Sequence, residues 1–195
     1  MRFSILLLLT ASIVFAAPIP KDKPILYFPT KVGDKRVYVG HGRGPDGASG
    51  GEIIEIVTAV EVEDGKFVVS LSKDFNGEQG GKFKCHVSTN GLFQTDPDSQ
   101  DHGRPILKLP ATKGDTWEVV DSPGRKTVYV VAGEEEVVVP AGKFKAIRID
   151  SSIESKKFPQ KESNWYVPGI GCVKHQCSIG PGEVTLLLKT FTPGK

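Results

Sequence analysis

Alternation between apolar and polar residues dominates the chain after its first 17 residues. No stretch there shows the repeat at i, i+3, i+4 and i+7 that is typical of an amphipathic helix, whereas β-branched residues recur in short runs of period two. The pattern predicts strands at residues 51–63, 66–72, 82–88, 92–95, 116–120, 126–131, 134–139, 143–151, 163–167, 172–178 and 183–190.

Two dipeptides predict how neighbouring strands connect. Asp64-Gly65 and Asn90-Gly91 each separate two predicted strands, and these residue types tolerate the positive φ of a tight hairpin turn. We therefore expect a mostly β protein, an antiparallel meander that forms a curved open sheet or half-barrel. The glycine-rich segment 40–50 and the segment 96–110 show no strand pattern and are interpreted as loops.

Short strings recur at an offset of roughly 80 residues. Pro29 to Arg36 resembles Pro110 to Trp117, with a shared Gly-Asp pair, and Gly65-Lys66-Phe67 resembles the string that begins at Gly142. The repeat predicts an internal duplication of about residues 25–95 and 106–195. Chance matches between such short strings are the alternative.

The first 17 residues have the three parts of a cleavable secretory signal peptide. Arg2 is a short positive region, residues 5–15 are apolar, and Val14 and Ala16 stand at the positions that signal peptidases read. The apolar run is too short for a spanning helix, which needs about 20 residues. The first cysteine is Cys85, so a lipid anchor at the cleavage point is not expected. We predict a protein that is exported to a periplasm or out of the cell without a stable membrane anchor.

Composition narrows the classes of partner and the number of domains that the chain can have. The 195-residue chain has a net charge of only +2, which disfavours nucleic acid as a partner. After removal of residues 1–17, residues 18–195 are enough for a single β domain. Trp117, Trp165 and Tyr166 lie in predicted strands and are interpreted first as core anchors.

Three cysteines and two nearby histidines are the candidates for chemistry. In an oxidising compartment, Cys85, Cys172 and Cys177 predict one disulfide, either Cys172–Cys177 or Cys85–Cys177. A metal site is the weaker alternative, with the donors Cys85, His86, Cys172, His175 and Cys177. A third alternative is a small hydrolase with a Cys–His pair, either Cys85 with His175 or Cys177 with His86. No catalytic signature surrounds these residues, so we expect neither a catalytic site nor a cofactor.

One string resembles a motif of exported bacterial β-proteins of unknown function. It is Asn164-Trp-Tyr-Val-Pro-Gly-Ile-Gly-Cys-Val-Lys174, close to the pattern Trp-Tyr-x-Pro-Gly-x-Gly-x-Val-Lys. The string from Val138 to Arg148 precedes it, as in that group, although Arg36 stands where the group often has Trp. The group is similar to β half-barrel domains, which include periplasmic lipoprotein carriers. The resemblance implies a curved antiparallel sheet with an apolar concave face, and no catalytic residue.

These observations favour a non-enzymatic exported protein that binds a hydrophobic ligand or a protein partner of the cell envelope. A ligand-binding module predicts an apolar concave face with open space. An enzyme predicts that cysteine and histidine side chains converge in a cleft. A purely structural envelope protein predicts a filled core.

Overall fold

The fold was analysed on a computed structural model, which describes residues 24–44, 47–95, 103–122, 125–154 and 159–195. The predicted signal peptide, residues 1–17, lies outside this described part. Within it every regular element is a strand, and none of the described residues forms a helix long and apolar enough to span a bilayer.

Twelve strands form one antiparallel sheet. The first six are β1 (Lys35–Gly44), β2 (Gly47–Glu63), β3 (Lys66–Phe75), β4 (Glu78–Ser88), β5 (Gly91–Thr95) and β6 (Arg104–Lys108). The last six are β7 (Thr116–Ser122), β8 (Arg125–Val139), β9 (Gly142–Glu154), β10 (Gln160–Val167), β11 (Gly171–Ile179) and β12 (Gly182–Thr192). The predicted mostly β, antiparallel meander is therefore confirmed.

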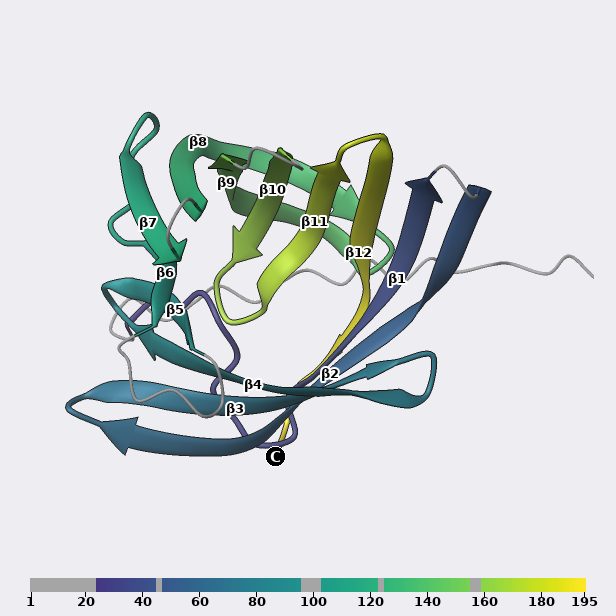
Figure 1. The fold of residues 1–195 in the computed structure, drawn as a ribbon. Helices are drawn as coiled ribbons and strands as arrows, with labels where there is room; N and C mark the ends of the chain where they lie inside the picture. Colours follow the sequence, from purple (N-terminus) through teal and green to yellow (C-terminus); the bar gives the residue numbers. More distant parts are fainter. Residues whose placement is uncertain (1–23, 45–46, 96–102, 123–124, 155–158) are drawn as a thin grey trace, which may run out of the picture.

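The order of strands curves the sheet into a nearly closed barrel. The sequence is β6-β5-β4-β3-β2-β1-β12-β11-β10-β9-β8-β7, so β1 and β12 join two six-stranded meanders. Strands β2–β4 form one wall and β8–β11 the opposite wall, with β6 and β7 facing each other on the far side from β1 and β12 (Figure 1). Because β6 and β7 are the two edges of the sheet, one seam of the barrel stays unsealed.

Both predicted hairpins are present, although the second turns at residues 89–90 and Gly91 already belongs to β5. Asp64 and Gly65 have φ values of 48° and 73°, as a two-residue hairpin turn requires.

Both predicted loops contain strand. In the segment 96–110, Arg104–Lys108 forms β6, because its backbone pairs with β5. The glycine-rich segment 40–50 is largely strand, and only residues 45–46 lie outside the described part. The reason is that β1 is central in the sheet. Arg43, for example, pairs with Ala48 on β2 and with Glu183 on β12, so backbone pairing on both sides outweighs the weak strand preference of glycine.

The two meanders repeat the same local hydrogen bonds at their first turns. Gly33 N–H donates to the Val57 carbonyl at 2.9 Å, and Gly114 N–H donates to the Val131 carbonyl at 2.9 Å. The next residue in each turn is an aspartate that accepts a backbone N–H, from Lys31 to Asp34 at 2.8 Å and from Thr112 to Asp115 at 2.9 Å. The register shifts agree as well, because one follows Val57 in the β2–β3 ladder and the other follows Val131 in the β8–β9 ladder.

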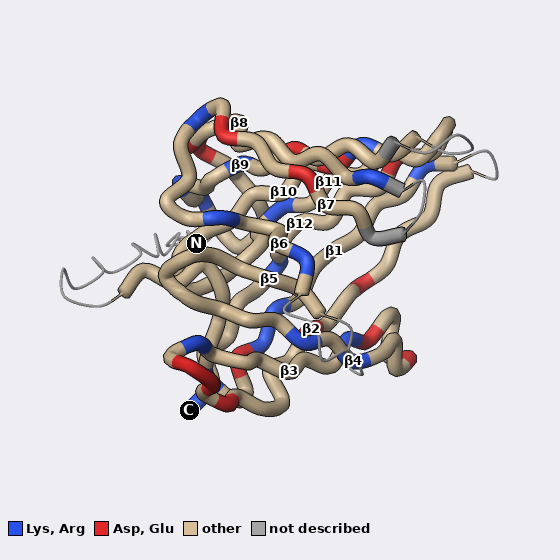
Figure 2. Tube along the Cα trace, turned by 60° about the vertical axis from the view of Figure 1, so that its left-hand side comes forward, with Lys and Arg blue, Asp and Glu red and all other residues tan. Residues whose placement is uncertain are grey.

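The largest core cluster lies inside the barrel and draws on both meanders. Its most deeply buried members include Val57, Val69 and Leu107 from the first meander and Ile149 from the second. Trp117 and Tyr166, predicted as core anchors, belong to this cluster. Charged residues of both signs are spread over the strands of both meanders rather than gathered in one stripe (Figure 2).

A second cluster includes Trp165, where the β8–β9 hairpin packs against β10–β12. Val137, Val139 and Trp165 are buried there, and the Ala141 N–H donates to the Leu188 carbonyl at 3.0 Å. The indole Nε1 of Trp165 donates to Glu135 Oε1 at 2.6 Å. The hairpin is thereby attached to the strands that it covers.

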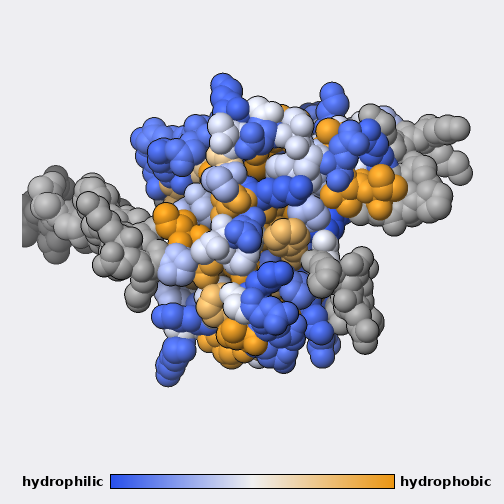
Figure 3. Space-filling view, turned by 90° about the vertical axis from the view of Figure 1, so that its left-hand side faces the viewer, coloured by the Kyte–Doolittle hydropathy of each residue, from blue (hydrophilic) through white to orange (hydrophobic). Residues whose placement is uncertain are grey.

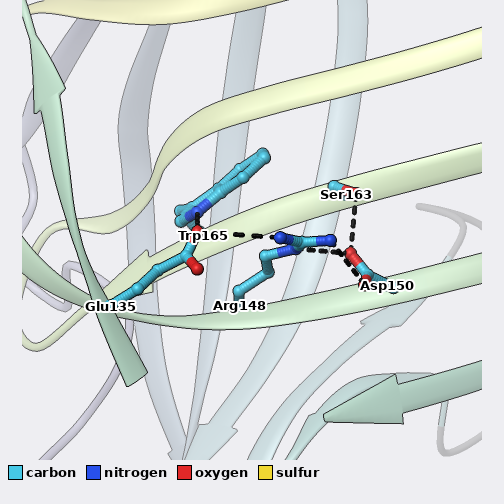
Figure 4. A network of polar contacts seen from close by, with 5 residues as sticks. All are labelled: Glu135, Arg148, Asp150, Ser163 and Trp165. Carbon is cyan, nitrogen blue, oxygen red and sulfur yellow. Dashed lines mark hydrogen bonds and ion pairs between the residues drawn. The ribbon is translucent and has the colours of Figure 1, made fainter. Parts of the chain in front are cut away.

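Polar contacts extend outward from Trp165 (Figure 4). Arg148 donates from Nε and Nη2 to the two carboxylate oxygens of Asp150, at 2.8 and 2.9 Å, and Ser163 Oγ donates to Asp150 at 2.6 Å. Burial alone would raise the pKa of Asp150, but the hydrogen bonds from Arg148 and Ser163 lower it below its ordinary value. Asp150 is therefore an anchored carboxylate at neutral pH and serves the packing of this hairpin.

Candidate functional site

A cavity of about 280 Å³ lies inside the barrel and is lined by both meanders. Many of its lining side chains are apolar: Phe28, Ile53, Leu71, Phe83, Leu92, Ile106, Tyr129, Tyr166 and Leu186. Clefts with mostly apolar walls and a few placed polar groups are typical of small-molecule sites. The apolar concave face with open space that the ligand-binding hypothesis requires is thus present.

A row of charged residues crosses one wall of this cavity. Arg36 on β1 pairs in register with Glu55 on β2, which pairs in register with Lys73 on β3. Arg36 Nη2 lies 2.8 Å from Glu55 Oε2, and Lys73 Nζ lies 3.5 Å from Glu55 Oε1. Adjacent strands place in-register side chains on the same face, so all three enter the cavity together.

Arg36 is the most deeply buried member of this row. Its side chain is 4% exposed, and its Nη1 also donates to the Ile170 carbonyl at 3.2 Å. Its guanidinium lies over the Phe28 ring at 4.5 Å from the centroid. Burial alone would lower the pKa of Arg36, but the neighbouring Tyr38 and Glu55 raise it above the ordinary value. Arg36 is therefore a permanent cation inside the barrel.

A row of aromatic residues occupies the corresponding place in the second meander. Trp117 on β7 pairs in register with Tyr129 on β8, which pairs with Ser151 on β9. The rings of Trp117 and Tyr129 stack with centroids 5.1 Å apart and planes 4° apart. The indole Nε1 of Trp117 donates to the Pro105 carbonyl at 3.0 Å, so this side chain spans the seam between β7 and β6.

The structure brings together only part of the predicted cysteine and histidine set. Cys85, Cys172 and His175 all line the cavity. In the β10–β11 ladder, Tyr166 pairs with Cys172 and Trp165 with Lys174, so Val173 is an extra residue in the strand. This bulge places Cys172 and His175 on the same face although they are three residues apart.

The other two members do not join this group. His86 follows Cys85 directly on β4, and successive side chains of a strand point to opposite faces. Cys177 lies further along β11, where its thiol accepts a hydrogen bond from Gln160 Nε2 at 3.3 Å. Among the described residues, no group of three or more His, Cys, Asp or Glu side chains is placed to hold a metal ion.

The predicted disulfide is absent, because all three cysteines are free thiols. Cys172 and Cys177 lie on one strand, and five residues at the rise of a strand separate their Cα atoms by roughly 15 Å. A disulfide needs about 7 Å or less. Cys85 lies on β4 in the first meander, far in strand order from Cys177 on β11. The disulfide was predicted from the oxidising compartment alone. The distances between the cysteines depend on how the strands pair, which the sequence does not reveal.

The two thiols in the cavity are not activated. Burial raises the pKa of Cys85 to about 12, and burial likewise raises the pKa of Cys172 to about 12. The thiolate is the nucleophile, so neither side chain is poised for attack at neutral pH. Cys172 Sγ instead donates to the Lys174 carbonyl at 3.1 Å and lies 3.7 Å from Asn164 Oδ1.

His175 contacts an amide rather than a thiol. Its Nδ1 lies 2.8 Å from Asn164 Oδ1. Burial lowers the pKa of His175, Glu162 raises it and Lys73 lowers it, with a net shift below the ordinary value. His175 is therefore a neutral, polar contact point in the cavity wall at neutral pH.

Sequence reasoning missed the residues that define the two rows. Only one signal for them was present in the sequence: the repeat aligns Arg36 with Trp117, a charged residue with an aromatic one. Glu55, Lys73 and Tyr129 had no local signal, because their roles depend on the register between strands.

Comparison with known proteins supports the fold. A candidate exported protein with a YmcC-like fold from Bacteroides fragilis matches with a TM-score of 0.61 and 14% identity, over 86% of this chain and 99% of that one. A candidate lipoprotein from Parabacteroides distasonis matches with a TM-score of 0.52 and 14% identity, over 88% of this chain and 100% of that one. No protein-family model and no curated sequence matches the chain. At this identity the likeness shows a shared fold.

Proposed function

We propose that this chain is an exported, non-enzymatic binding protein that holds a small hydrophobic molecule inside its barrel. The observation that carries the proposal is the cavity of about 280 Å³, with mostly apolar walls contributed by both meanders. A purely structural protein would gain stability by filling such a space, because empty apolar volume costs dispersion contacts. The signal peptide predicted at residues 1–17 supports export.

The enzyme hypothesis has less support from the same cavity. It requires a cysteine and a histidine in direct contact, whereas Cys172 Sγ and His175 Nδ1 lie 3.7 and 2.8 Å from one shared acceptor, Asn164 Oδ1, and Cys172 also donates to the Lys174 carbonyl. Buried thiols with a pKa of about 12 are structural groups. A binding role uses the apolar walls and does not need these thiols to react.

The seam offers a route to the interior. Arg104 and Ile106, on the edge strand β6, both line the cavity. On the face that carries β6 and β7, hydrophobic residues reach the surface between hydrophilic ones (Figure 3). A small molecule that enters here meets the cavity lining without crossing a paired part of the sheet.

The test is saturable binding of the neutral fluorescent probe N-phenyl-1-naphthylamine to the purified mature protein. We expect one site per chain, with fluorescence enhancement as the probe enters an apolar space. Ile106→Trp adds bulk at the cavity lining and is expected to weaken binding about tenfold or more, through the overpacking of a confined site. The matched control is Val62→Trp, which adds the same side chain at a position that is 67% exposed.

Two results would overturn the proposal. One is the absence of saturable binding by the folded wild-type protein. The other is equal affinity of wild type and Ile106→Trp when circular dichroism shows that both are folded, since the probe would then bind elsewhere.

A further inference from the structure

Two polar side chains of the cavity wall keep hydrogen-bonding groups that no described residue satisfies. His175 on β11 and Asn164 on β10 form an in-register pair, and both line the cavity. They contact each other through His175 Nδ1 and Asn164 Oδ1, which leaves His175 Nε2 and Asn164 Nδ2 without a partner among the described residues. In this part of the chain the only fully buried side-chain atom without a partner is Thr127 Oγ1, so both of the free atoms reach open space.

The contact between the two residues fixes what each free atom can do. An amide oxygen only accepts hydrogen bonds, so His175 Nδ1 donates to Asn164 Oδ1 at 2.8 Å. Burial and Lys73 hold the pKa of His175 below its ordinary value against the effect of Glu162, so the ring is neutral at pH 7.5 and carries a single N–H. Nε2 is therefore an acceptor, whereas Asn164 Nδ2 is a donor. The cavity wall thus offers one acceptor and one donor from the same residue pair.

The fold does not require a polar side chain at the position of Asn164. By the register shifts that match β2–β3 with β8–β9, Leu71 corresponds to Ile149. Leu71 pairs with Phe83 on β4. Ile149 pairs with Asn164 on β10, so Phe83 is the counterpart of Asn164 in the first meander. An apolar ring therefore fits this part of the frame. A polar group in an apolar wall costs free energy unless it is hydrogen-bonded, so the pair points to a partner that enters the cavity.

The charged residues of the lining give no reason to expect an ionic ligand. Arg36 and Lys73 both contact Glu55, at 2.8 and 3.5 Å. Glu162 accepts a hydrogen bond from a neighbour on its own strand, and Arg104 is engaged in an interaction as well. The polar part of the ligand is therefore expected to be neutral.

We propose that the ligand is a neutral amphiphile with a single hydroxyl group, which donates to His175 Nε2 and accepts from Asn164 Nδ2. A hydroxyl both donates and accepts, as this pair requires, whereas an ether oxygen or a carboxylate only accepts. Leu186 pairs in register with His175 and lines the cavity, so apolar wall begins beside the hydroxyl. The inference rests on the binding function proposed above and names the class of ligand for the same cavity.

Two ligands with the same carbon and oxygen atoms test the hydroxyl: 1-octanol and methyl heptyl ether. Each competes with N-phenyl-1-naphthylamine for the mature protein at pH 7.5, and the loss of probe fluorescence gives its affinity. We expect octanol to bind about tenfold tighter, because the ether has no proton for His175 Nε2 and leaves this acceptor unsatisfied. Octanoate also lacks that proton and should bind more weakly than octanol.

One substitution tests the assignment to His175. His175→Phe keeps a ring and removes the acceptor, so it should reduce the preference for octanol over the ether to near unity. The preference is a ratio measured on each variant, and a change in cavity size affects both ligands alike. The matched control is His41→Phe, the same exchange at an exposed position on β1, which should leave the tenfold preference intact.

The outcomes separate this inference from the proposed function. Equal affinity of octanol and the ether for the wild-type protein, tighter binding of octanoate, or failure of both neutral ligands to displace a bound probe overturns the hydroxyl inference and leaves a hydrophobic binding site. A preference that survives in His175→Phe, shown to be folded by circular dichroism, overturns the assignment to His175. The wild-type ratio decides the ligand class whether or not this variant folds. Absence of saturable probe binding overturns both the inference and the binding function.

Discussion

The two meanders build the same frame and fill it with opposite chemistry. In the first, the in-register pair that faces the cavity is Arg36–Glu55, held by an ion pair of 2.8 Å. In the second, the corresponding pair is Trp117–Tyr129, held by ring stacking at 5.1 Å. The frame needs these positions to be occupied and matched across strands. It does not dictate whether charge or aromatic surface occupies them.

The two junctions between the meanders differ in a related way. At one, β1 and β12 pair from Lys35–Thr192 to Arg43–Glu183. At the other, β6 and β7 are sheet edges, and the Trp117 indole reaches the Pro105 carbonyl across the gap. Pro105 has no backbone N–H, and β6 is only 5 residues long, so this edge is a poor template for strand pairing. One junction therefore joins the meanders by backbone pairing, whereas at the unsealed seam a side-chain hydrogen bond bridges them.

The largest expected effect comes from breaking the charged pair on one side only. Glu55→Ala leaves Arg36 buried without its carboxylate, and we expect it to lower the free energy of unfolding by about 3–5 kcal/mol. The double variant Arg36→Met with Glu55→Leu makes the first meander apolar like the second and should recover most of that loss. Urea denaturation followed by circular dichroism measures both. A double variant as unstable as Glu55→Ala would show that the charged row is needed for folding.

The two matched aspartate turns allow a second, smaller comparison. Asp34 is 5% exposed and accepts N–H groups from both Lys31 and Gly194, each at 2.8 Å. Asp115 accepts the Thr112 N–H in an exposed hydrogen bond of 2.9 Å. We expect Asp34→Ala to cost about 2–3 kcal/mol and Asp115→Ala about 1 kcal/mol, because Asp34 leaves two donors unsatisfied. Equal losses in urea denaturation would mean that the bond to Gly194 contributes nothing.

The sequence predicted the parts of this structure that depend on local patterns. Period-two alternation and turn residues located the strands because each strand buries one face, and Asp64-Gly65 set its own turn. The register between strands is a tertiary property, so the Glu55–Lys73 contact had no signal. The bulge at Val173, which turns Cys172 and His175 to one face, had none either. We propose that internal duplication explains the matched turns, which is what the repeated strings predicted.

A buried hydroxyl marks a further difference between the meanders. Thr127 on β8 is 2% exposed, and its Oγ1 has no hydrogen-bond partner among the described residues. By the register that aligns Val57 with Val131, the matching residue of the first meander is Ile53. Thr127→Val keeps the shape and removes the unsatisfied group, so we expect a gain of about 1 kcal/mol in the free energy of unfolding. The control is Thr58→Val on β2, whose exposed hydroxyl donates to the Ser70 carbonyl at 3.2 Å and should give no gain. An unchanged or lower stability of Thr127→Val would indicate that this hydroxyl has a partner in solution.

The smallest expected effect concerns which side of the cavity responds to pH. The first meander contributes Arg36, a permanent cation, while the second contributes His175, whose pKa is lowered by burial and by Lys73 against the opposing effect of Glu162. A histidine with a folded-state pKa below its ordinary value of 6.5 binds fewer protons when folded than when unfolded. The free energy of unfolding should therefore be constant above pH 6.5 and fall as the pH drops from 6.5 toward the lowered pKa of His175.

His175→Gln should flatten this decline in urea midpoints measured between pH 7.5 and 5, whereas His41→Gln, at an exposed position on β1, should leave the decline unchanged. If wild type and His175→Gln decline in parallel, the imidazole is not the group that couples this cavity to pH.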